Sequence, residues 1–145
     1  MDWKAAAGVV PAEESGILTG SRIVFAVAAA AFLLQIKTAT RYGYFRDELY
    51  YLDCARHLAW GYVDQPPLIA FLAWLERRLG GGSLVSLRFL PAAAGALTVW
   101  MTGRLARILG SGVLGQTLAA LGLLVAPGFL LMFHLVTMNA FEPLL

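Results

Sequence analysis

The chain alternates between long apolar stretches and one extended polar loop. The apolar stretches predict transmembrane helices over residues 17–39, 84–108 and 112–133, and residues 137–145 read as the start of a fourth. Each of the first three is about 20 residues long, the length that an α-helix needs to cross a bilayer. The pattern therefore predicts an all-α integral membrane protein with about three complete transmembrane helices plus the start of a truncated fourth.

The first apolar stretch has a competing interpretation. Its core from Ile23 to Ile36 has a length that is also typical of a signal peptide. Arg22 and Lys37 at its edges can extend toward the membrane surface, which allows a full crossing. A charged segment precedes the core and further apolar stretches follow it, so we expect a retained helix behind a flexible cytoplasmic tail at residues 1–16.

The loop at residues 40–83 has a pattern of its own, which predicts two amphipathic helices on the membrane surface. The first begins at Asp47 and Glu48, where carboxylates suit the helix dipole, and we expect it to end near Gly61. The second begins at "PPL", since proline is favoured in the first helical turn. Its apolar stripe consists of Leu68, Phe71, Leu72, Leu75 and Leu79, and Glu76, Arg77 and Arg78 mark its polar end.

Composition narrows the class of protein. Hydrophobic residues make up 59% of the 145 residues and charged residues 14%, which is typical of a membrane protein. The net charge of +2, without a basic run, indicates no nucleic-acid partner. Cys54 is the only cysteine, which excludes an internal disulfide and a cysteine-based zinc site.

The acidic residues of the loop have two interpretations. Asp47 and Asp64 suit helix N-caps, and Glu48 suits a solvated ion pair with Arg41 or Arg46. Alternatively, the two predicted helices bring these carboxylates to one membrane face, where partial desolvation raises their pKa values and lets them act as bases. The surrounding aromatic residues suit an interfacial belt: Tyr42, Tyr44, Trp60, Tyr62 and Trp74.

Three segments carry a resemblance to a known family: "FRDELYY" after the first apolar stretch, "YVDQPPL" about 17 residues later, and "LRFLPAAAGALTVWMTGRLARILG". With "TMNAFEPLL" they resemble a membrane glycosyltransferase of the GT-C type. The nearest group is the bacterial relatives of protein O-mannosyltransferases (glycosyltransferase family 39), and the aminoarabinose transferases of lipid A are cousins. These enzymes have about a dozen spans, so the chain resembles their N-terminal quarter or third.

The resemblance implies a function. Such enzymes transfer a sugar, here a mannose-like hexose or similar, from a polyprenyl phosphate carrier to a hydroxyl of a protein, lipid or glycan. The reaction occurs at the extracytoplasmic face of the cell inner membrane, which places the loop outside. The charges give mixed signals: Arg104 and Arg107 indicate a cytoplasmic link after the second helix, whereas the loop and its edges carry seven cations interleaved with acids.

The resemblance also implies roles for individual residues. Asp47 matches the catalytic base, Glu48 a substrate-positioning residue, and Asp64 an acid near the acceptor or a divalent metal. Gln65 is also expected to bind substrate, although it stands where the lipid A cousins carry lysine and the mannosyltransferases histidine. Three further residues are expected to bind substrate: Arg46 by stabilising the leaving phosphate, and Asn139 and Glu142 from the membrane face of Asp47.

Two alternatives are weighed against this function. A non-catalytic membrane module, such as a transporter or scaffold fragment, would use the carboxylate-rich loop to bind a cation or partner. The predicted mid-membrane polar residues Gln35, Thr98 and Gln116 are not ionisable, which disfavours an ion relay. An oligosaccharyl transferase would show an Asp-X-Asp pair in the first loop, and the loop has none. We expect the isolated chain to be inactive, because the rest of the cavity is missing.

Overall fold

The computed structural model describes residues 12–144, and all of the regular elements in this range are helices, with no strand among the described residues. The helices are α1 (Ala12–Thr38), α2 (Arg46–Cys54), α3 (Pro67–Gly80), α4 (Leu84–Leu87), α5 (Phe89–Ile108), α6 (Val113–Val125) and α7 (Pro127–His134). The short 3-10 helices η2 (Met138–Ala140) and η3 (Glu142–Leu144) follow. The prediction of an all-α chain is confirmed for these residues.

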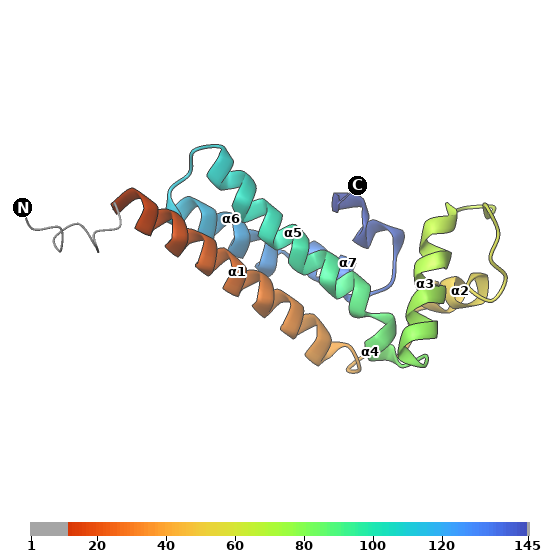
Figure 1. Ribbon diagram of the computed structural model, residues 1–145. Coiled ribbons are helices and arrows are strands. Elements are labelled where there is room, and N and C mark those ends of the chain that lie inside the picture. The colour runs from red at the N-terminus through yellow and green to blue at the C-terminus, as the bar shows by residue number, and fades with distance from the viewer. Residues whose placement is uncertain (1–11, 145) are drawn as a thin grey trace, which may run out of the picture.

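A bundle of α1, α5 and α6 forms the body of the molecule (Figure 1). Its core contains small or branched side chains: Val24, Ala28, Ala31, Val99 and Ala120. A Cβ atom placed on Gly103 would lie 2.5 Å from Cγ1 of Val24, and one on Gly95 would lie 2.7 Å from Cγ of Phe133. The neighbouring helices therefore approach closely at both glycines.

Two helical segments are long and apolar enough to cross a membrane, Leu18–Thr38 and Leu84–Ile108. The pair α6 and α7 is a third if it acts as one span, and it bends by 64°. The bend falls at Ala126, which is extended because Pro127 follows it. The break between α4 and α5 at Arg88 was not predicted.

The two ends of the chain differ from the sequence prediction. A tail was predicted for residues 1–16. Positions 1–11 of it lie outside the described residues, and α1 already begins at Ala12. The fourth transmembrane helix was predicted to begin at position 137. The described part of that segment, through Leu144, forms the 3-10 helices η2 and η3 instead of a regular α-helix, and a fourth span stays a prediction.

Helices α2 and α3 lie beyond the end of the bundle where α1 ends and α5 begins, and α3 runs across that end (Figure 1). They share a second small core, with Tyr51, Ala55, Ile69, Ala73, Leu87 and Val136 buried in it. Helix α3 buries the face that contains Ile69 and Ala73. Part of its predicted apolar stripe is exposed, at Leu68, Phe71 and Leu79.

The first loop helix is shorter than predicted. We expected it to end near Gly61, but α2 ends at Cys54. The hydroxyl of Tyr62 lies 3.1 Å from the carbonyl oxygen of Cys54 and 3.0 Å from that of His57, and it accepts a hydrogen bond from the Ala59 amide. Tyr62 therefore binds the end of the helix and folds residues 55–66 into a loop.

Glu76 was predicted at the polar end of α3, but it is buried. One oxygen accepts a hydrogen bond of 2.9 Å from the backbone N–H of Leu90 at the start of α5, and the other has no partner among the described residues. Burial raises the pKa of Glu76 to about 8, helped by the nearby charge of Glu48 and opposed by the Leu90 hydrogen bond. Glu76 is therefore mostly protonated at neutral pH.

Candidate functional site

A cavity of about 480 Å³ brings two of the predicted site carboxylates together. Arg46, Asp47 and Tyr50 line it from α2, and Val63 and Asp64 from the loop that follows. Asp47 and Asp64 are 17 residues apart in the chain, and the folding of residues 55–66 brings them to one cavity. Asp47 and Asp64 thus share a cavity, whereas a common membrane face and the chemical role of these acids stay predictions.

Neither aspartate is a helix N-cap, so the structural alternative raised from the sequence is wrong. Phe45 occupies the N-cap position of α2 and Pro66 that of α3, both with extended backbone. Asp47 is the second residue of α2, where its charge is favoured by the helix dipole without a capping hydrogen bond. Both carboxylates are therefore available to the cavity.

Asp64 is held by a neighbour on α2. The hydroxyl of Tyr50 donates a hydrogen bond of 2.7 Å to Oδ1 of Asp64. This bond to the carboxylate is the main cause of a raised pKa of Tyr50, with burial adding to it. Tyr50 thus remains a protonated donor at neutral pH, and it orients Asp64 while leaving the second carboxylate oxygen free of the tyrosine.

Asp47 lies in a more open setting. Nε of Arg46 is 3.2 Å from Oδ1 of Asp47, and the two side chains are 89% and 38% exposed. An exposed ion pair of this kind contributes little to stability. Asp47 can therefore replace Arg46 with a ligand at a small cost in free energy. The guanidinium of Arg46, the preceding residue, remains near that ligand.

Glu48 has a different environment from its neighbour. It has no exposed surface, and both of its oxygens are paired with Arg88, at 2.9 Å to Nε and 2.7 Å to Nη2. Its carboxylate also accepts the backbone N–H groups of Phe45, at 2.9 Å, and Val136, at 3.2 Å. Glu48 therefore fixes the start of α2, and any effect on a substrate is exerted by positioning. The solvated pair with Arg41 or Arg46 that the sequence suggested does not form.

Arg88 is the site residue that sequence reasoning missed. It is buried in the break between α4 and α5, and besides Glu48 it donates to the carbonyl oxygens of Ala39, Tyr42 and Gly43. A signal was present, because an arginine inside a predicted span requires a buried partner. Arg88 thereby connects the end of α1, the start of α2 and the start of α5 at one point.

Three other predicted site residues do not line this cavity. Gln65 is buried and its amide donates to Sγ of Cys54 at 3.4 Å. Asn139 and Glu142 are exposed on η2 and η3. None of the three lines the cavity of Asp47, so the structure does not bring them to it.

The donor set bears on the divalent metal that the resemblance allows. Across residues 12–144, no group of three or more His, Cys, Asp and Glu side chains is placed to hold a metal ion. A cation at Asp47 and Asp64 would need further ligands from a substrate.

Comparison with known proteins gives no relative: no family model, no curated protein and no solved structure matches this chain. The resemblance to glycosyltransferases therefore rests on the sequence segments quoted above.

Proposed function

We propose that this chain provides the catalytic-base part of the active site of a multi-pass glycosyltransferase in the cell inner membrane. The observation that carries the proposal is the shared cavity of Asp47 and Asp64 at the end of an apolar helical bundle. A carboxylate that is only weakly paired, beside an arginine, is suited to a reaction in which one oxygen loses a proton and another leaves with negative charge.

The proposed reaction is transfer of a hexose from a polyprenyl phosphate to an acceptor hydroxyl. The hydroxyl oxygen attacks the anomeric carbon of the sugar, the bond from that carbon to the phosphate oxygen breaks, and the polyprenyl phosphate leaves with the bonding electrons. The carboxylate of Asp47 takes the hydroxyl proton. The exposed guanidinium of Arg46 lies where it can stabilise the phosphate as negative charge develops.

Asp64 and Glu48 have supporting roles in this proposal. Asp64, oriented by Tyr50, binds acceptor hydroxyl groups through its free oxygen. Glu48 acts through the backbone that it fixes, because its carboxylate is enclosed and paired with Arg88. The resemblance assigned Glu48 to substrate positioning, and we propose that it does so indirectly.

Placement in the membrane follows from the apolar helices. In the proposal α1 and the segment Leu84–Ile108 cross the bilayer, the bent pair α6 and α7 forms a third crossing, and α2 and α3 lie on the extracytoplasmic surface. The exposed side chains of Leu68, Phe71 and Leu79 support this placement, because they would meet lipid instead of water.

The test is a chromosomal substitution, so that the protein is made in its native cell. Membranes are supplied with radiolabelled polyprenyl phosphate mannose, and label is counted in the protein, lipid and glycan fractions. Asp47→Asn should lower transfer by about a hundredfold or more, since general-base catalysis contributes roughly 10²–10⁴. Asp53→Asn is the matched control, because Asp53 is exposed on the same helix and does not line the cavity.

Two results would contradict the proposal. One is transfer by Asp47→Asn within about fivefold of the unsubstituted protein when both reach the membrane in equal amounts. The other is an equal loss in Asp53→Asn. In the same assay, we expect no turnover by the purified 145-residue chain, and sustained turnover would show that the chain already contains a complete site.

A further inference from the structure

One side of α3 carries two adjoining cavities of different chemistry. Pro67, Phe71, Trp74 and Arg78 are spaced by four, three and four residues, so they project from the same side of the helix. Pro67 and Phe71 line an apolar cavity of about 580 Å³, and Trp74 and Arg78 line a second cavity of about 390 Å³. The rings of Phe71 and Trp74 stack with centroids 5.7 Å apart, which makes the wall continuous from one cavity to the other.

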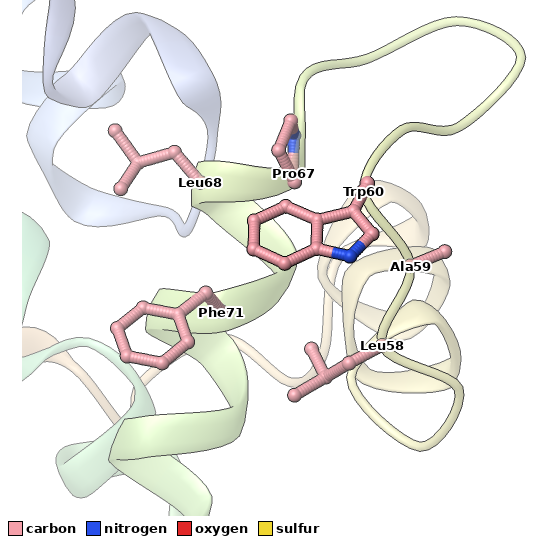
Figure 2. A pocket seen from close by; sticks show the side chains of 6 residues that line it. All are labelled: Leu58, Ala59, Trp60, Pro67, Leu68 and Phe71. Carbon is pink, nitrogen blue, oxygen red and sulfur yellow. The ribbon is translucent and has the colours of Figure 1, made fainter.

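The apolar cavity lies between α3 and the loop after α2. Its lining is Leu58, Ala59, Trp60, Pro67, Leu68 and Phe71. Figure 2 shows the indole ring of Trp60 over the space between loop and helix, with Leu68 and Phe71 projecting from the helix. Trp60 is 98% exposed. An apolar hollow bordered by an exposed indole is suited to a hydrocarbon chain at a membrane surface.

The second cavity is basic. Arg56, Arg77 and Arg78 line it together with Ala55 and Trp74, and Arg78 lies over the Trp74 ring at 5.7 Å. Within the described part of the chain, none of the three arginines has a carboxylate oxygen within 4.0 Å. Arg77 and Arg78 lie in the C-terminal turn of α3, and Arg56 directly follows the C-cap of α2, so the three cations come from the C-terminal ends of two helices. Three exposed guanidinium groups at one cavity favour an anion, and phosphate is one of the anions whose geometry the guanidinium matches.

We infer that these two cavities form one binding site for an anionic membrane phospholipid, with its phosphate at Arg56, Arg77 and Arg78 and an acyl chain in the apolar cavity. The inference rests on the membrane placement proposed above, and it is independent of the sugar-transfer reaction. Free phosphate would account for the arginines alone, and a neutral lipid for the apolar cavity alone. An anionic phospholipid accounts for both and for their common wall.

The experiment uses the 145-residue chain in a neutral detergent. Phosphatidylglycerol, phosphatidylcholine and inorganic phosphate are titrated separately, and binding is followed by the melting temperature and by native mass spectrometry of retained lipid. We expect phosphatidylglycerol to bind at least tenfold more tightly than phosphatidylcholine. Phosphate alone should bind weakly and should not displace phosphatidylglycerol at millimolar concentration.

Variants assign the preference to the site. The triple substitution R56Q/R77Q/R78Q should remove the preference for phosphatidylglycerol. R104Q/R107Q is the matched control, because Arg104 lies over Trp100 at 5.3 Å near the other end of the bundle and reproduces the arginine–tryptophan contact. Trp60→Ser should weaken binding of phosphatidylglycerol several-fold and leave binding of inorganic phosphate unchanged.

All of the site arginines are exposed, so folding should be preserved, and the melting temperature without lipid checks this. If the triple variant unfolds, R56Q alone serves, with an expected loss of at least threefold. Equal affinity for the two lipids, an equal loss in R104Q/R107Q, or full displacement by phosphate would each overturn the inference. None of these outcomes changes transfer by the Asp47 variants, so the two proposals fail separately.

Discussion

Replacing Arg88 should lower the free energy of unfolding strongly. Replacing both Arg88 and its partner Glu48 should cost much less than the sum of the two single replacements. The Arg88 and Glu48 side chains are 2% and 0% exposed and share two hydrogen bonds of 2.7 and 2.9 Å. Arg88→Leu leaves a buried carboxylate without a counter-charge, which costs about 3–5 kcal/mol. In Glu48→Leu/Arg88→Leu no charge is left unpaired, so we expect a coupling free energy of about 2–3 kcal/mol.

The free energy of unfolding is measured in dodecyl maltoside by titration with dodecyl sulfate, followed by far-ultraviolet circular dichroism, for both single variants and the double variant. The adjacent Arg46–Asp47 pair supplies the control cycle, because it is exposed at 89% and 38% and should show a coupling below about 1 kcal/mol. Additive effects at Glu48 and Arg88, within about 0.5 kcal/mol, would refute this reasoning. They would show that the pairing of these two buried charges does not offset the cost of removing them from water.

Three further predictions concern the helices. On folding the pKa of Glu76 rises from 4.5 to about 8, so the unfolded chain releases this proton first as the pH rises. Stability should therefore fall by roughly 3–4 kcal/mol between about pH 5 and pH 8 and level off above about pH 9, and Glu76→Gln should flatten a pH series of melting temperatures. An unchanged slope in the variant would contradict this. Gly103→Ala should cost about 1–3 kcal/mol by overpacking against α1, whereas Gly122→Ala, with nothing within 4 Å of the added carbon, should cost nothing by this mechanism. Gln35 lies 2.9 Å from the His134 ring, so a double-mutant cycle of Gln35→Leu and His134→Phe should give about 0.6 kcal/mol in dodecyl sulfate unfolding, and zero coupling would count against that bond.

Much of the helical layout follows from local pattern. The apolar stretches and the Pro67 start of α3 appear where the sequence predicts them, because hydrophobic length and proline geometry act over a few residues. The early end of α2 was missed, since it depends on Tyr62 reaching back to Cys54 across the loop. Helical spacing alone contains no information on that contact.

The site was predicted in part, for a related reason. Asp47 and Asp64 were singled out by residue type and spacing, and they do line one cavity. The burial of Glu48 was not foreseen, because its partner Arg88 is 40 residues away and was counted only among the loop cations. A charge inside a span has to be paired, but the sequence does not say with which acid.

The Glu48 carboxylate has a consequence for the order in which the protein is made. Two of its donors, Arg88 and the backbone N–H of Val136, lie 40 and 88 residues later in the chain. The segment containing Asp47 is therefore synthesised before either donor, so α2 lacks these two contacts until residues 88 and 136 have been added. The hydrogen bonds that fix Glu48 beside Asp47 are therefore completed only after the helices α5, α6 and α7 have been synthesised.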